Sequence, residues 1–185
     1  MIQRRLWSTR YLYYYHTPDF LEDAPAERKD YPIVFEPLAN IYPKYYSQLS
    51  ELFNKFTLEY LRIKFNRADP YMFLMLSNDI VVHCTFFAKP SSYSEYQIID
   101  HDTYVVGPGF TKAEFRGKGM LPSAMMTFRA SPMGRHGLSG FMLVDNASSY
   151  RALEKAGLKR IFRFRHDVRF GFNFFHIEER YSQRL

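Results

Sequence analysis

Two glycines flank a lysine in the stretch FTKAEFRGKGMLPSAM, residues 110–125, and this stretch joins two segments of different periodicity. Residues 102–111 have strand character, and their Gly-Pro-Gly sequence at 107–109 indicates a bulge or a splay. After the glycines, apolar residues recur at helical spacing, at Leu121, Met125 and Phe128. A strand, a glycine turn and a helix in succession restrict the chain to folds that mix the two kinds of element.

A turn of this kind leaves backbone N–H groups exposed at the helix N-terminus, where the helix dipole favours an anion. Arg116 and Lys118 add positive charge there, and Pro122 lies in the first helical turn, where its missing N–H costs little. The stretch therefore predicts a pyrophosphate site. Two other phosphate motifs do not fit, because Met120 follows Gly119 where a P-loop needs Lys, and Pro122 replaces the third glycine of the dinucleotide fingerprint. Taken alone, the stretch is explained equally well as an ordinary strand-to-helix turn with solvated basic residues.

The remaining elements follow from apolar spacing and turn residues. Strands are predicted at residues 4–15, 31–38, 71–76, 80–87 and 140–146, helices at 44–65 and 148–157, and two C-terminal strands at 158–164 and 168–174 that turn around His166-Asp167. In the first helical segment the apolar residues follow one helical period, which predicts one amphipathic helix or two consecutive ones: Leu49, Leu52, Phe53, Phe56, Tyr60 and Ile63.

This order predicts an α/β (α+β) fold, with a mixed, mostly antiparallel central sheet flanked by helices. Residues 1–30 are expected to form an aromatic N-terminal arm and a polar loop. Residues 31–185 are expected to form the main domain.

Charge and cysteine content limit the classes of function. The net charge of +6 at pH 7 fits an anionic cofactor or substrate, nucleic acid or a membrane surface. The single cysteine, Cys84, cannot build a disulfide framework or a Cys-based metal site, and no His, Asp and Glu grouping has metal-binding spacing, so no metal is expected. No apolar stretch approaches the roughly 20 residues that span a bilayer, and the N-terminus does not resemble a signal peptide, so a soluble cytoplasmic protein is expected.

A second motif, NASSYRALEKAGL at residues 146–158, follows the glycine turn. Together the two motifs resemble the GNAT superfamily of N-acetyltransferases, in which a strand leads into R-G-x-G and a helix, and a later strand ending in Asn leads into a second helix. The resemblance covers residues 104–158, with five positions of the second motif at matching spacings: Asn146, Ser149, Glu154, Lys155 and Gly157. It implies the GNAT fold, in which the fourth and fifth core strands splay apart, and acetyl-CoA as the donor substrate.

The resemblance also implies a role for each matched position. The backbone of Phe110 and Thr111 would bind the pantetheine arm of acetyl-CoA, and Asn146 and Ser149 would lie beside that arm near the sulfur. The pyrophosphate would be wrapped by Arg116, Gly117, Lys118, Gly119, Met120 and Leu121.

Two positions depart from the family pattern. Leu121 replaces a small residue at the end of the first motif, and Leu153 stands where many members carry the Tyr that protonates the leaving thiolate. Tyr150 lies one helical turn earlier and is better explained as a core aromatic. Solvent is then left as the proton source.

Acyl transfer to an amine also needs a group that polarises the carbonyl and a base for an ammonium acceptor. The N–H of Phe110 or Thr111 is the candidate for polarisation. Asp102 is the first candidate for the base and His101 the second, although polar residues at a strand entry explain both equally well. His83 is a third candidate, for which a hydrogen-bonded strand histidine is the preferred explanation.

The resemblance implies direct transfer of an acyl group from acetyl-CoA to a primary amine of a small molecule, and an amino sugar is one candidate acceptor. The acceptor site is expected at residues 44–68 and 88–101, where Tyr93 and Tyr96 could line a groove. A non-catalytic acyl-CoA-binding module and a transferase for protein or peptide amines stay open as alternatives. Nucleic-acid binding is not expected, because the basic residues are dispersed; a homodimer is compatible with the sequence.

Overall fold

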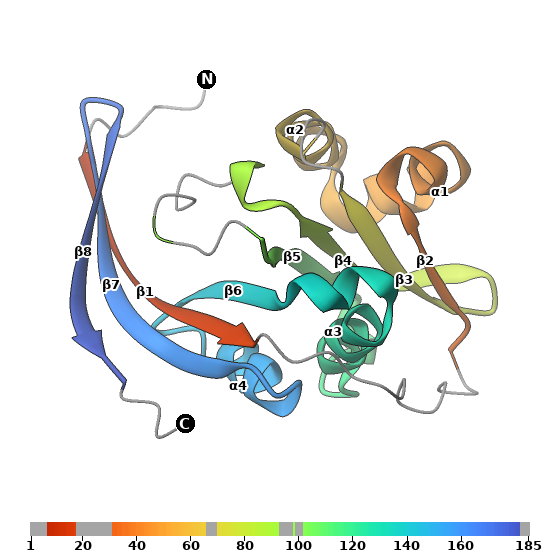
Figure 1. Ribbon diagram of the computed structural model, residues 1–185. Helices are drawn as coiled ribbons and strands as arrows, with labels where there is room; N and C mark the ends of the chain where they lie inside the picture. Colours follow the sequence, from red (N-terminus) through yellow and green to blue (C-terminus); the bar gives the residue numbers. More distant parts are fainter. Residues whose placement is uncertain (1–6, 18–30, 66–69, 93–97, 99–101, 182–185) are drawn as a thin grey trace.

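The computed structural model describes residues 7–17, 31–65, 70–92, 98 and 102–181. One 8-stranded sheet has the order β2-β3-β4-β5-β6-β1-β7-β8 (Figure 1). Its strands are β1 (Trp7–Thr17), β2 (Ile33–Pro37), β3 (Tyr71–Ser77), β4 (Ile80–Ala88), β5 (Tyr104–Thr111), β6 (Leu138–Leu143), β7 (Lys159–Arg169) and β8 (Phe172–Arg180). All neighbouring pairs are antiparallel except β5 and β6, which are parallel. The predicted mixed, mostly antiparallel sheet is confirmed.

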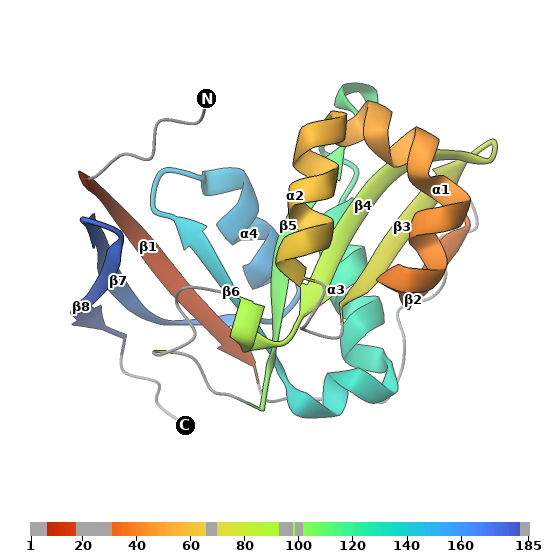
Figure 2. The ribbon, with the colours of Figure 1, turned by 90° about the horizontal axis from the view of Figure 1, so that it is seen from above.

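Helices cover both faces of the sheet. The helices α1 (Leu38–Phe53) and α2 (Lys55–Phe65) lie on one face, and α3 (Met120–Ala130) and α4 (Ala147–Lys155) on the other (Figure 1). Strand β3 is buried on both sides: Leu74 packs toward α1 and α2, and Phe73 packs toward α3 and α4. Figure 2 shows that α1 and α2 lie over the half of the sheet formed by β2 to β5, and that β1, β7 and β8 form the other end. No helix in the described part of the chain is long and apolar enough to cross a membrane.

The N-terminal strand lies inside the sheet. β1 pairs with β6 through Leu12 and Leu143, and with β7 through Leu12 and Phe164. Residues 7–17 are therefore a strand inside the sheet, and a strand was expected at residues 4–15. The expected polar loop lies, beyond Thr17, outside the described residues.

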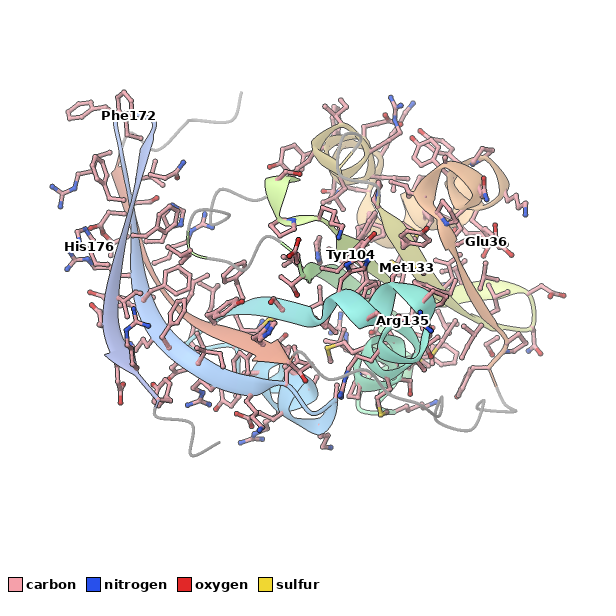
Figure 3. All side chains as sticks on the ribbon, viewed as in Figure 1. Glu36, Tyr104, Met133, Arg135, Phe172 and His176 are labelled. Carbon is pink, nitrogen blue, oxygen red and sulfur yellow. The ribbon has the colours of Figure 1, made fainter. Side chains whose placement is uncertain are left out.

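The C-terminal hairpin is longer than predicted. Its turn lies at Phe170-Gly171, where both residues have positive φ (51° and 86°), and not at His166-Asp167. His166 and Asp167 are buried inside β7, and Thr9 Oγ1 donates a hydrogen bond to the Asp167 carboxylate at 2.7 Å. β8 is an edge strand, and Phe172 near the hairpin tip is 70% exposed (Figure 3).

The helical segment at 44–65 breaks into two helices at Asn54. Asn54 has a φ of 61°, and its side-chain Oδ1 accepts a hydrogen bond from the backbone N–H of Thr57 at 3.0 Å, so it ends one helix and caps the next. This break resets the helical phase. α2 buries Leu58 and Leu61, whereas Phe56 is 90% exposed. Of the two alternatives, one helix or two consecutive ones, the second is confirmed. The prediction that Phe56, Tyr60 and Ile63 continue the buried face was wrong.

Candidate functional site

The two strands β5 and β6 part midway along β5. They pair at Tyr104–Leu138, Val105–Ser139 and Val106–Gly140. Beyond Val106, β5 continues to Thr111 paired with β4. The predicted splay is confirmed. It begins at the Gly-Pro-Gly segment 107–109, where proline lacks the N–H that a central strand needs.

A pocket of about 570 Å³ opens at this splay. Its walls come from β4, the second half of β5, the glycine turn, the start of α3 and one face of α4. Eight of the predicted cofactor-binding residues line it: Phe110, Thr111, Arg116, Gly117, Gly119, Met120, Leu121 and Ser149. Lys118 and Asn146 do not line it.

The glycine turn has the conformation that only glycine adopts easily. Gly117 has a φ of 76° and Gly119 a φ of 72°, and Gly119 is the N-cap of α3. A Cβ at Gly117 would meet nothing within 4 Å, so this glycine serves the backbone conformation and leaves the adjacent N–H groups uncovered. The first N–H groups of a helix lack partners within the helix and are available to an anion.

Three cationic side chains line the pocket: Arg116, Arg151 and Lys155. No carboxylate is found among the described residues of its wall. Arg116 reaches back to the end of β5, where its Nε donates to the carbonyl oxygen of Thr111 at 3.3 Å. Lys118 instead lies over the Phe115 ring, with Nζ 4.7 Å from the ring centroid. The pocket therefore suits an anion with more than one charge.

The register of β4 and β5 shows which backbone groups face the splay. The N–H of Lys112 donates to the carbonyl of Val82 at 2.9 Å, so the next pair, His83 and Thr111, is a pair without mutual backbone hydrogen bonds. Backbone polar groups alternate in direction along a strand, so those of Thr111 and Gly109 point away from β4 and into the splay. Those of Phe110 point toward β4.

His83 lies on the pocket wall and is 1% exposed. Its Nδ1 is 2.7 Å from Thr111 Oγ1, and its Nε2 is 2.8 Å from Thr85 Oγ1. Burial lowers the pKa of His83 to about 4, and the backbone of Phe110 opposes this only in part. The imidazole is therefore neutral at pH 7, in agreement with a hydrogen-bonded strand histidine.

The second motif holds α4 in place. Asn146 Oδ1 accepts from the backbone N–H of Ser149 at 3.2 Å, so Asn146 is the N-cap of α4. Gly157 has a φ of 83°, and its N–H donates to the carbonyl of Glu154, so it ends the helix as predicted. Asn146 thus positions the pocket wall, and Ser149 belongs to that wall.

Neither Leu153, which stands at the position of the family's acidic Tyr, nor Tyr150 one turn earlier faces the pocket. Leu153 is fully buried, and its side chain packs so close to β6 that a Cβ at Gly140 would lie 2.6 Å from Leu153 Cδ2. Tyr150 packs edge-on against Tyr13, with 6.1 Å between ring centroids, and does not line the pocket. The interpretation of Tyr150 as a core aromatic agrees with this contact.

Asp102, the first predicted base, lies two residues before the start of β5, whereas the pocket opens at the other end of this strand. Asp102 is exposed and does not line the pocket. His101, Tyr93 and Tyr96 lie outside the described residues. In the described part of the chain no group of three or more His, Cys, Asp or Glu residues could hold a metal.

Sequence reasoning gave no binding role to two basic wall residues, Arg151 and Lys155, although Lys155 is a matched position of the second motif. Arg151 and Lys155 are four positions apart on α4 and so share one face of the helix. The four-residue spacing could be seen in the second motif. The sequence did not show which side of α4 would face the splay.

No protein-family model and no curated protein matches the chain. Solved structures do resemble it. A GNAT-family acetyltransferase from Novosphingobium aromaticivorans is 12% identical over 85% of this chain and 63% of its own, with a TM-score of 0.52. A GNAT-family acetyltransferase from Colwellia psychrerythraea is 10% identical over 94% and 57%, with a TM-score of 0.56. A GCN5-related N-acetyltransferase-like protein from Streptococcus suis is 14% identical over 86% and 62%, with a TM-score of 0.53.

The chain spans less than two thirds of the length of each of these three proteins. At these identities the likeness concerns the fold. The splayed sheet, the glycine turn before α3 and these neighbours agree, and the chain has the fold of the GNAT-family acetyltransferases.

Proposed function

We propose that the chain transfers an acyl group from acetyl-CoA to a primary amine of a small molecule, with an amino sugar as one candidate acceptor. One observation carries this proposal: an open strand edge and a cationic helix N-terminus belong to the same pocket, and no carboxylate lies among its described wall residues. A long ligand with an amide-bearing arm and a phosphate-bearing end fits such a pocket.

The wall residues fit the parts of the donor. The uncovered N–H groups at Gly117 to Met120, together with Arg116, would hold the pyrophosphate. The outward N–H and C=O groups of Gly109 and Thr111 would pair with the amides of the pantetheine arm, which takes the place of the missing strand. Acetyl-CoA supplies the activated acyl group as a thioester.

The register supports Thr111, one of the two expected donors, and Gly109 in place of Phe110 as the groups that polarise the carbonyl. Because the N–H of Phe110 points toward β4, Gly109 and Thr111 are the backbone donors that could polarise a carbonyl in the splay. Arg116 and His83 each bind one oxygen of Thr111, the carbonyl and the hydroxyl, and so fix this strand end.

The acceptor nitrogen has to be neutral when it attacks. His83 is too weak a base at a pKa of about 4 to take a proton from an ammonium group. Asp102 and His101 stay the proposed bases, reached through water or through the acceptor itself. With Leu153 buried and Tyr150 turned to the core, the leaving thiolate takes its proton from solvent.

The first test is calorimetric titration with acetyl-CoA. We expect binding by the native chain and at least a tenfold loss in Arg116→Glu, because a cation at the phosphates becomes an anion. The control Lys55→Glu makes the same charge change on α2 and should bind normally. No binding by the native chain would refute the proposal.

The second test is release of free thiol from acetyl-CoA with amino sugars, polyamines and peptides as acceptors. Release with a small amine supports the proposed activity, and release only with peptides indicates a protein or peptide acetyltransferase. Binding without turnover by any acceptor would favour a non-catalytic acyl-CoA-binding module. The specific observation in favour of that alternative is that no carboxylate lies on the described pocket wall and that burial lowers the pKa of its histidine, His83, to about 4.

A further inference from the structure

Helix α4 separates its charges between two sides. Glu154 faces the sheet, where its Oε1 accepts from Arg160 Nη2 at 3.0 Å and from Tyr15 Oη at 3.1 Å. The guanidinium of Arg160 is held there by rings as well, with Cζ 4.1 Å from the Tyr13 centroid. Glu154, the acidic residue of α4, is therefore paired with Arg160 and does not line the pocket.

Arg151 and Lys155 line the pocket from a neighbouring face of α4, about 60° and about 100° around the helix axis from Glu154. Both are exposed, and neither forms an ion pair with a carboxylate within the described ranges. One helical turn separates them, so their charged ends can converge on one group. Two cations held together without a counter-ion favour a dianion at this place.

The pocket thus has two cationic regions on different helices. The first is the glycine turn with Arg116 at the start of α3, and the second is the Arg151–Lys155 pair on α4. CoA carries two separated phosphate groups, the pyrophosphate in the chain and a monophosphate on the 3′-oxygen of its ribose. The number of cationic regions matches the number of phosphate groups.

We propose that Arg151 and Lys155 form a subsite for the 3′-phosphate of CoA, so that the chain distinguishes CoA from 3′-dephospho-CoA. This inference rests on the proposed use of acetyl-CoA. A phosphate monoester is largely a dianion at pH 7 and accepts charge-assisted hydrogen bonds from guanidinium and ammonium groups. The pair would supply affinity and donor selectivity, and it would touch no reacting atom.

The test is a calorimetric comparison of two ligands, CoA and 3′-dephospho-CoA, with the native chain and Arg151→Gln/Lys155→Gln. We expect the native chain to bind CoA about 10-fold to 100-fold more tightly than 3′-dephospho-CoA. The double variant should lose this preference and keep its affinity for 3′-dephospho-CoA. The matched control, Lys44→Gln/Lys55→Gln on α1 and α2, removes two cations and should keep the preference.

Each outcome separates the inference from the function on which it rests. Equal binding of both ligands by the native chain refutes the 3′-phosphate subsite and leaves acetyl-CoA binding intact. An equal loss for both ligands in the double variant also refutes it, because the pair would then bind the pyrophosphate. Absence of binding by either ligand overturns the proposed function itself. Thermal unfolding of the variants checks folding, and no change is expected because both side chains are exposed.

Discussion

Replacing His83 with glutamine should remove a pH-dependent loss of stability between pH 7 and pH 5. The imidazole is 1% exposed, both its nitrogens contact threonine hydroxyls, and burial lowers its pKa from 6.5 to about 4. Glutamine has one donor and one acceptor group and can serve the same two hydroxyls, but it does not titrate.

The sign follows from proton binding. Between pH 6.5 and pH 4 the unfolded chain protonates His83 and the folded chain does not, so the free energy of unfolding falls as the pH falls. The full shift corresponds to about 3 kcal/mol, of which about 2 kcal/mol is lost between pH 7 and pH 5. This contribution is complete above pH 6.5, where His83 is neutral in both states.

The measurement is urea-induced unfolding of the native chain and His83→Gln at pH 7 and pH 5. Carboxylates such as Asp167, whose pKa is lowered by the hydrogen bond from Thr9, titrate in both proteins and cancel in the comparison. We expect the native chain to lose about 2 kcal/mol more than the variant over this range. Equal losses in the two proteins would refute the argument, because His83 would then be protonated as easily in the folded chain as in water.

Three further sets of substitutions test the cap of α4, the packing of α4 on β6 and the buried face of α2. Asn146→Ala should lower the free energy of unfolding by about 1 kcal/mol, because it removes the N-cap of α4, and Asn146→Asp should not; urea unfolding measures both, and equal values would contradict the cap. Gly140→Ala should cost about 1 to 3 kcal/mol in the same assay, because its Cβ would lie 2.6 Å from Leu153 Cδ2; an unchanged midpoint would show that α4 can move away. On α2, Leu58→Ala should cost about 2 to 5 kcal/mol, whereas Phe56→Ser should stay within about 0.5 kcal/mol since Phe56 is 90% exposed; a large loss for Phe56→Ser would mean that this face is covered.

Much of the site could be predicted from the sequence because its determinants are local. Gly117 and Gly119 are required by their own positive φ values, and Asn146 and Gly157 mark the two ends of α4 by short-range hydrogen bonds. The spacing of residues within each motif was therefore enough to predict the glycine turn and the two ends of α4. The Gly-Pro-Gly sequence indicated a bulge or a splay, and the family resemblance was needed to expect a splay between two core strands, because its position depends on where β6 stops pairing with Val106.

Other features depend on contacts between distant residues. The position of His83 on the pocket wall follows from its pairing with Thr111 across two strands. The exposed face of α2 follows from the conformation of Asn54, because a single residue with a φ of 61° shifts the helical period that the apolar residues suggested. A helical period that is continued from α1 across Asn54 into α2 therefore assigns the wrong face of α2 to the core.

The predicted position of the C-terminal hairpin turn was wrong for a different reason. A turn is predicted at His166-Asp167 because both residues are polar. In the structure both side chains have partners on neighbouring strands: Thr9 Oγ1 donates to Asp167, and Asn173 Oδ1 lies 2.8 Å from His166 Nε2. Phe170 occupies the actual turn with a φ of 51°, a conformation that bulky residues seldom adopt.

The position of β1 also sets an order of folding events. Thr9 contacts Asp167 at a separation of 158 residues, and β7 and β8 reach the rest of the sheet only through β1. Among the described strands, β1 is synthesised long before its partners β6 and β7, and closing so long a loop slows the search for native contacts. Until those partners exist, the backbone groups of this tyrosine-rich strand can pair only with water or with strands of other chains. The last event in assembling the sheet is therefore expected to be the pairing of β1 with β6 and β7. Aggregation during refolding would compete with that pairing.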